Sequence, residues 1–458
     1  MVFSSPVFLF AFLPAVFLLE RLCPSLRAKN IFLAAASLVF YAFGQLVFLP
    51  LFLGSVLLNY LAGLGLCRLQ KGRKALLILA VVLNLLLLGI FKYGDFLLQN
   101  LGREPVGILL PIGISFFTFQ GMSYVIDVYR DPESGTADFG KLLLYLAFFP
   151  QLIAGPIVKY HDIAPQIDQR RTDPVSTEEG LRRFIRGLGK KLLIADAAGK
   201  IADAVFAGGT QDIRLAWLAA VCYTLQIYYD FSAYSDMAIG MGRMFGFALR
   251  ENFLHPYAAV SIRDFWRRWH VSLSSWFKEY LYIPLGGNRR GRLRTALNRL
   301  LVFLCTGFWH GANWTFVIWG LGHGLLSSLE GVLPVRKLQE KPWGRLLGRI
   351  YTLLAVTLLF VIFRAESLRA AGAMLGVMFA GSLTAAGSVQ MISLLQPASL
   401  LALALAIVFA GGLREKLYAR LDAPAFRHLA RAGSLALLFL CILSLSTGGF
   451  HPFLYFQF

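Results

Sequence analysis

The sequence predicts an all-α polytopic membrane protein, and three observations support this fold class. Hydrophobic residues make up 57% of the 458 residues and charged residues only 15%, whereas roughly a quarter of a typical soluble domain is charged. The apolar residues form long continuous runs, which favour spanning helices over the alternating pattern of a β-barrel. The net charge is +19. In so apolar a chain, excess Lys and Arg is typical of cytoplasmic loops rather than of a surface for nucleic acid.

The apolar runs set the expected number of membrane crossings. A spanning helix needs about 20 mostly apolar residues, and because several runs are shorter we expect about 11 transmembrane helices. The weaker runs are expected to lie at the interface between the membrane and water. The candidate runs are residues 7–19, 31–43, 51–66, 75–91, 108–125, 142–157, 215–229, 300–316, 350–363, 370–391, 400–410 and 434–445.

A polar stretch at residues 159–191 separates the runs at 142–157 and 215–229. Its second half, residues 176–191, has apolar residues at helical spacing and Glu178 and Glu179 in the expected first turn. This pattern predicts an amphipathic helix that lies along the membrane surface, with Ser176 or Thr177 as its N-cap.

The segment at residues 261–294 is too charged to span a membrane and too aromatic for a solvated loop. On a helical projection Trp266, His270, Leu273 and Phe277 share one face. We therefore expect one interfacial or re-entrant helix here. Charged, irregular backbone at membrane depth is tolerated where it is buried in protein or lines a wet cavity, so the segment is a candidate functional site.

Two histidines are candidates for chemistry. His310 lies well inside the apolar run at 300–316, and ionisable residues within a membrane mark functional sites by default. A neutral imidazole in an apolar pocket can accept the proton of a hydroxyl, which acyl transfer to an alcohol requires. The alternative is a histidine that only links helices by hydrogen bonds. His270 is expected to assist, and His323 is expected to lie on roughly the opposite side of a continued helix and to serve packing.

Asp230 and Asp236 stand beside apolar stretches and are six residues apart, so they do not share a helical face. They could bind substrate or pair with a buried arginine such as Arg243, and we favour a structural hydrogen-bond network. No metal is expected, because no two histidines are three or four residues apart.

Six segments taken together resemble the membrane-bound O-acyltransferase family, and within it the branch that acetylates alginate. Their order and combination are more specific than any one of them. The resemblance runs from near residue 110 to about residue 325 and returns at the C-terminus. One departure is Leu254-His255-Pro256, where we expect an Asn-Pro-Tyr pattern. The segments are residues 149–157, 229–247, 251–257, 261–287, 309–311 and 452–458.

The resemblance implies a single domain over residues 1–458 whose helices surround a central tunnel. It also implies that His310 is essential and that His270 occupies the second functional position. Acetyl-coenzyme A is the implied donor, reaching the histidines from the cytoplasmic side, with no bound cofactor. An extracytoplasmic acyltransferase or another polysaccharide-modifying partner would complete the transfer from the bacterial inner membrane. We expect substrate contacts from Trp266, Trp269, Trp309, Asn313, Asp230 and Asp236.

Other functions remain open from the sequence. The branch that transfers D-alanine to teichoic acids shares part of the pattern, although residues 230–240 look more like the polysaccharide-acetylating branch. A transporter of acyl or polysaccharide species would use the histidines as pathway residues. A non-catalytic scaffold for a secreted transferase would tolerate their loss. The basic run from Arg289 to Arg294 is explained by cytoplasmic charge or by attraction of a phosphate-bearing donor.

Overall fold

The computed structural model describes residues 1–333, 335, 339–411, 413, 426–447 and 452–454. The described chain is helical, as expected, and its one strand-like pairing is an isolated bridge between Asp212 and Ser382. It forms two compact units. Residues 1–184 and 234–251 make the first unit, and residues 185–233 and 252–458 make the second.

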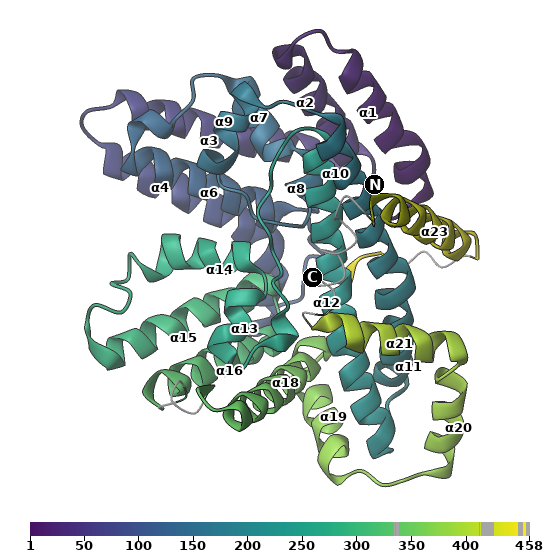
Figure 1. The fold of residues 1–458 in the computed structure, drawn as a ribbon. Coiled ribbons are helices and arrows are strands. Elements are labelled where there is room, and N and C mark those ends of the chain that lie inside the picture. The colour runs from purple at the N-terminus through teal and green to yellow at the C-terminus, as the bar shows by residue number, and fades with distance from the viewer. Residues whose placement is uncertain (334, 336–338, 412, 414–425, 448–451, 455–458) are drawn as a thin grey trace. The chain divides into compact units, whose positions relative to one another are not determined.

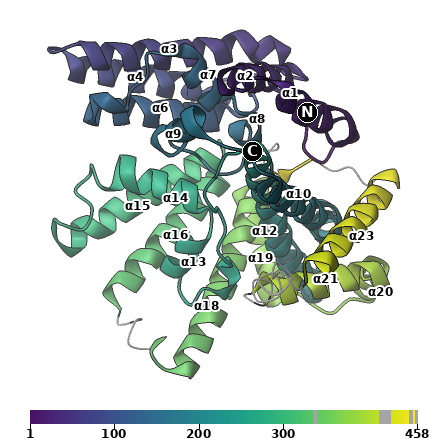
Figure 2. The ribbon, with the colours of Figure 1, turned by 45° about the horizontal axis from the view of Figure 1, so that its top comes forward.

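The first unit is built mostly from the N-terminal helices, coloured purple to blue in Figure 1. Helices α3, α4 and α6 pack against one another, and Figure 2 shows them side by side. Its helices are α1 (Leu13–Leu22), α2 (Leu26–Ala42), α3 (Leu49–Arg68), α4 (Arg73–Leu88), α5 (Gly94–Asn100), α6 (Ile114–Arg130), α7 (Phe139–Ala147), α8 (Phe149–Leu152) and α9 (Tyr160–Gln169).

Two helices contribute residues to both units, α10 (Pro174–Gly189) and α12 (Ile213–Met244). Helix α10 confirms the predicted helix but begins earlier than expected. Its N-terminal turn is closed by Asp173, whose Oδ1 accepts a hydrogen bond from the amide of Ser176 at 2.9 Å. The expected caps, Ser176 and Thr177, therefore lie inside the first turn.

The second unit contains residues 261–294 and 309–311, which the sequence singled out, in green in Figure 1. Its core is an aromatic cluster that includes Tyr228, Phe265, Trp269 and Trp319. Its helices are α11 (Asp196–Gly208), α13 (Ile262–Arg268), α14 (Val271–Phe277), α15 (Gly291–His310), α16 (Trp314–Val332), α18 (Pro342–Arg364), α19 (Leu368–Ala380), α20 (Ala385–Leu394), α21 (Pro397–Ala410) and α23 (Arg427–Ser446).

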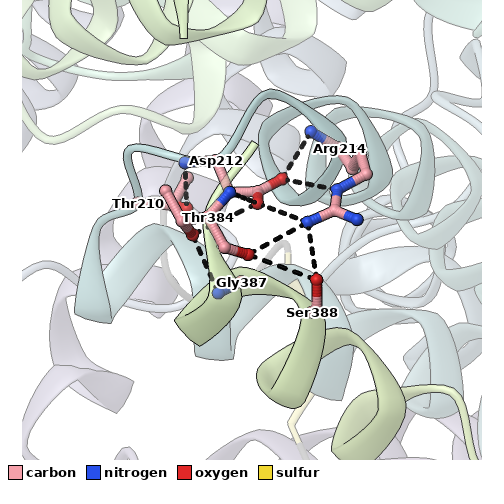
Figure 3. Close-up of polar contacts among 6 residues, drawn as sticks. All are labelled: Thr210, Asp212, Arg214, Thr384, Gly387 and Ser388. Carbon is pink, nitrogen blue, oxygen red and sulfur yellow. Dashed lines mark hydrogen bonds and ion pairs between the residues drawn. The ribbon is translucent and has the colours of Figure 1, made fainter. Parts of the chain in front are cut away.

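A polar cluster ties the start of α12 to the loop between α19 and α20 (Figure 3). Asp212 caps α12 by accepting a hydrogen bond from the amide of Arg214 at 2.9 Å, and it also accepts one from the amide of Thr384 at 2.8 Å. The guanidinium of Arg214 reaches Asp212 and Ser388. These hydrogen bonds hold the pKa of Asp212 well below its ordinary value. The cluster accordingly fixes two loops that are distant in sequence.

Within the described residues, four helical segments are long and apolar enough to cross a membrane: Leu46–Arg68, Arg73–Asn100, Pro342–Arg364 and Arg427–Ser446. Helices α20 and α21 pass the same test as a pair bent by 79°. The apolar run at 300–316 does not form one helix, because α15 ends at His310 and α16 begins at Trp314. The expected count of about 11 crossings therefore stays a prediction.

Candidate active site

His310 is the last residue of α15, and it is buried with 6% of its surface exposed. The backbone is extended at Gly311, and α16 then begins behind Asn313, whose Oδ1 accepts a hydrogen bond from the amide of Thr315 at 3.0 Å. The side-chain Nδ2 of Asn313 donates to the carbonyl oxygen of Glu366 at 2.9 Å. The predicted contact residue Asn313 thus holds the turn that presents His310.

Helices α15 and α16 form a tightly packed antiparallel pair. A Cβ atom at Gly307 would collide with the carbonyl of Phe316, and one at Gly320 would collide with the carbonyl of Phe303. Glycine at these positions lets the two backbones approach closely. This pairing corrects the expectation for His323. It lies not on the far side of one continued helix but on the neighbouring helix of the pair that presents His310.

His270 lies at a break between α13 and α14, with a left-handed backbone conformation at φ 43°. The expected single helix over this segment is therefore wrong, and the four residues of its predicted face belong to two helices and the break. His270 is 0% exposed. Its Nδ1 lies 3.2 Å from Oδ1 of Asn252, which also accepts a hydrogen bond from the hydroxyl of Ser272 at 2.9 Å.

Burial lowers the pKa of His270 to about 3, so its imidazole is neutral at physiological pH. Its Nε2 has no hydrogen-bond partner within the described residues. A neutral imidazole whose Nδ1 proton is held by Asn252 presents an acceptor lone pair at Nε2. His270 is therefore uncharged, and its Nε2 can accept a hydrogen bond.

A row of aromatic rings connects three buried histidines of the second unit, His270, His310 and His323. The ring of Trp309 lies 5.7 Å from His270 and 5.1 Å from His310, measured between centroids. The ring of Trp319 then lies 5.0 Å from both His310 and His323. The rings of Trp309 and Trp319 thus lie between the imidazoles.

The row ends at Trp266, whose ring lies 5.2 Å from His323 and 5.7 Å from Trp319. Trp269 lies apart from the row and packs instead against Phe253 and Phe360. The structure thus brings Trp266 and Trp309 together with the histidines, while Trp269 supports the core. Both ring nitrogens of His323 and the indole nitrogen of Trp266 lack a hydrogen-bond partner in the described residues.

Buried polar atoms without a protein partner are rare and mark places that bind water or a polar ligand. His323 is such a residue, and reasoning from the sequence assigned it to packing. The signal that could have found it is its intramembrane position, which is as unusual as that of His310.

Asp230 takes part in a buried ion-pair cluster. The Nζ of Lys191 lies 2.7 Å from Asp230 and 2.8 Å from Asp196, and the second oxygen of Asp230 accepts a hydrogen bond from the amide of Leu454 at 2.9 Å. This is the structural network that the sequence analysis favoured. Its basic member is Lys191, and the cluster fixes the C-terminal segment at Leu454 to the second unit. The residues 455–458 of the predicted family segment lie outside the described residues.

Asp236 belongs to the first unit and therefore not to the unit that contains the histidines. It accepts two hydrogen bonds from Arg183, at 2.8 and 3.1 Å, and Arg183 also pairs with Glu251. The expected partner Arg243 pairs instead with Glu179. The local role of Asp236 is thus to anchor Arg183.

The arrangement around His310 and His270 suits proton transfer in a dry, apolar setting. Low local polarity strengthens each electrostatic interaction and limits hydrolysis of a reactive thioester. As for metal binding, no group of three His, Cys, Asp or Glu side chains in the described ranges lies close enough to hold an ion. The imidazoles of His270 and His310 are groups that can carry out acid–base chemistry.

Comparison with known proteins identifies the family of this chain. Residues 46–372 match the profile of the membrane-bound O-acyltransferase family. A probable alginate O-acetylase of Azotobacter vinelandii is 41% identical over the whole of both chains. The corresponding protein of Pseudomonas aeruginosa strain PAO1 is 44% identical over 83% of this chain and 75% of its own.

A peptidoglycan O-acetyltransferase of Helicobacter pylori is 39% identical over 81% of this chain and 78% of its own length. The family match covers more than half of the chain and includes both His270 and His310. The chain therefore belongs to the membrane-bound O-acyltransferase family and is a membrane enzyme that transfers acyl groups.

Proposed function

We propose that this enzyme transfers an acetyl group from acetyl-coenzyme A toward a hydroxyl of an exported or cell-envelope polysaccharide, with His310 and His270 at its centre. Alginate is the first candidate acceptor, because the relatives from Azotobacter and Pseudomonas are named for it. Peptidoglycan is the second, on the basis of the relative from Helicobacter. The proposed acceptor hydroxyl belongs either to the sugar or to an extracytoplasmic acyltransferase partner.

The proposed reaction exchanges a thioester for an ester. The imidazole of His310 takes the proton of the acceptor hydroxyl as its oxygen attacks the thioester carbonyl carbon. A carbon–oxygen bond forms, the carbon–sulfur bond breaks, and the proton passes to the leaving thiolate. The products are an acetyl ester and free coenzyme A. His270, held by Asn252, orients the acceptor or relays the proton through its Nε2.

One observation carries the proposal: two buried imidazoles, of His270 and His310, both contact the ring of Trp309 in one compact unit. A histidine that only linked helices would need no second imidazole nearby. A pocket of about 330 Å³ at the end of α18, which His310 itself does not line, offers a place for the acceptor. It is lined by Arg364 and Glu366, next to Phe363, whose ring lies 5.3 Å from His310.

The experiment is a label-transfer assay with the full-length protein in lipid nanodiscs. Wild type and His310→Ala are incubated with acetyl-labelled coenzyme A, with envelope extract as the source of acceptor and partners. We expect wild type to release coenzyme A and transfer label, and His310→Ala to lose at least about 100-fold in rate, the usual contribution of a positioned base. The matched control is His428→Ala, because His428 is exposed on α23.

Full activity of His310→Ala would show that His310 is not the catalytic base. No coenzyme A release by wild type, even with extract, would favour the transporter or scaffold functions. D-alanine transfer to teichoic acid is distinguished in the same assay, because acetyl label would then stay on the donor. The central tunnel and the crossings beyond the four candidate spanning segments are part of the proposal.

A further inference from the structure

We infer that a basic pocket on the outer side of α13 binds the phosphate groups of the acyl donor. The pocket has a volume of about 900 Å³ and lies where the start of α13 meets the end of α16. Arg263, Arg267, Glu330 and Gln339 are among the residues that line it. The identity of the donor rests on the proposed function, whereas the anion site rests on the geometry of the second unit alone.

The pocket presents guanidinium groups that form no salt bridge with a carboxylate among the described residues. Arg263 and Arg267 are exposed, and within the part of the chain that the structure describes neither side chain makes a hydrogen bond or an ion pair. Arg299 adds a third positive charge beside Gly331, where a Cβ would collide with its Nη1. Partial burial lowers the pKa of Arg263, and the neighbouring charges of Arg299 and Arg267 lower it further.

The two carboxylates of the pocket are already engaged. Glu330 accepts hydrogen bonds from the amides of Ile262 and Arg263, at 2.6 and 3.0 Å, and so caps the start of α13. Asp264 accepts a hydrogen bond from Arg268 at 3.0 Å. Asp264 is paired with Arg268, so Glu330 is the one carboxylate of the described pocket lining that offsets the charges of Arg263, Arg267 and Arg299, and the pocket stays net positive.

An anion that carries several negative charges fits this arrangement. Guanidinium groups bind phosphate oxygens through paired hydrogen bonds, and several of them together favour a ligand with more than one phosphate. Coenzyme A carries a diphosphate and a sugar phosphate at one end of the molecule, and its thioester is at the other end. A phosphate-bearing lipid headgroup shares the chemistry and is the other possible source.

The position of the pocket relative to the histidines favours the coenzyme. Helix α13 faces the pocket with Arg263 and Arg267, while Phe265 and Trp266 on the same helix contact His323. The row of rings then leads from His323 to His310 along α16. About 24 Å of helix separates Glu330, at the pocket, from Trp314 at the other end of α16. An elongated donor anchored by its phosphates would extend its acyl end along this row.

The test measures binding of unacylated coenzyme A, which requires no catalysis. Full-length protein is placed in phosphatidylcholine nanodiscs, and the Kd is measured by equilibrium binding of labelled coenzyme A. We expect Arg263→Gln/Arg267→Gln to raise the Kd roughly tenfold or more, because two charge-assisted contacts are lost. Arg27→Gln/Arg103→Gln is the matched control, since it removes two exposed arginines of the first unit and should leave the Kd unchanged.

Two further probes decide the source of the phosphate and guard against misfolding. Pantetheine, which lacks phosphate, should bind wild type and the double variant equally, and the milder Arg267→Gln should give an intermediate Kd. An unchanged Kd in the double variant would show that this pocket does not bind the phosphates of coenzyme A, even if His310→Ala abolishes transfer. Anionic phosphatidylglycerol that displaces coenzyme A from wild type but not from the double variant would reassign the pocket to a lipid headgroup.

Discussion

At position 270 the backbone adopts a left-handed conformation that few residues other than glycine take. Such strain persists only where the surroundings fix it. Here the amide of Val271 donates to the carbonyl of Asn252 at 2.9 Å, and the amide of Leu254 donates to the carbonyl of Arg268 at 2.8 Å. These two hydrogen bonds hold the break between α13 and α14 and point the imidazole into the aromatic row.

Asn252 gives the first prediction at the residue scale, as a positioning residue for His270. Asn252→Ala removes the acceptor for Nδ1, so Nε2 is no longer fixed as the acceptor nitrogen. We expect kcat to fall about fivefold, the effect of one net hydrogen bond, while KM changes little. The measurement is steady-state acetyl transfer in nanodiscs. A proportional loss of folded protein without a change in kcat would show that Asn252 has only a structural role.

The conservative variant Asn252→Asp provides a second readout. A carboxylate beside His270 stabilises the imidazolium, so it raises the pKa of His270 from its low value. A base with a raised pKa becomes protonated at higher pH and loses its acceptor lone pair. The acid limb of the pH–rate profile for kcat should therefore move to higher pH in Asn252→Asp. An unchanged acid limb would mean that His270 does not exchange a proton in the reaction.

At the element scale, the close packing of α15 and α16 positions His310. We predict that Gly320→Ala destabilises the protein by about 1–3 kcal/mol, because its methyl group would overlap the backbone of α15 at Phe303. The free energy of unfolding is measured by detergent-induced unfolding in mixed micelles. The control is Gly372→Ala on α19, where nothing lies within 4 Å of an added Cβ.

That control should be neutral or stabilising by about 0.4–1 kcal/mol, since alanine restricts the unfolded chain without a clash. Equal stability of Gly320→Ala and wild type would contradict the close approach of the two helices.

The helix boundaries show how far the sequence could predict the elements. The break after His310 has a local signal, because Gly311 and the N-cap residue Asn313 are typical of a helix end and a helix start. The apolar run obscured that signal. The break at His270 has no local signal, since it depends on Asn252, eighteen residues away in sequence. Hydrophobic periodicity alone predicts one helix there, and the long-range hydrogen bonds override it.

At the scale of the whole chain, composition correctly predicted a helical membrane protein. Each segment that crosses a bilayer needs about 20 mostly apolar residues, so such a chain has a high apolar content. The candidate histidines were predictable for a related reason, since a buried ionisable residue is conspicuous in an apolar run. The basic pocket was not predictable. Arg263 and Arg267 look like ordinary interfacial charge, and only the packing of α13 and α15 against α16 places Glu330 and Arg299 near them.

Helix α18 links the two proposed substrate pockets of the second unit. Its start lies beside the basic pocket, where a Cβ at Gly348 would meet the carbonyl of Val260. Its last residue, Arg364, lines the pocket of about 330 Å³. The 23 residues of α18 are about 34 Å of helix, enough to cross a hydrocarbon layer of about 30 Å. Donor and acceptor would then enter from opposite faces of the membrane.

The distribution of charge assigns those faces. The basic pocket lies at the end of the second unit where α15 and α18 begin. The basic run from Arg289 to Arg294 leads into α15 at this end, and Lys341 and Arg345 lie near the start of α18. By the positive-inside rule this end is cytoplasmic. We predict that Lys341→Cys reacts with a membrane-impermeant maleimide only from the cytoplasmic side, and that Glu366→Cys reacts only from the outside.

Both positions are exposed, and the background replaces the accessible cysteines Cys23, Cys67 and Cys305 by serine. Labelling is compared in intact spheroplasts and in inverted membrane vesicles, because each preparation exposes one face. Labelling of both cysteines in the same preparation would contradict a spanning α18 and would place both pockets on one side of the membrane. Opposite labelling supports a path in which the acyl group enters beside α13 and leaves beside Glu366, past His310.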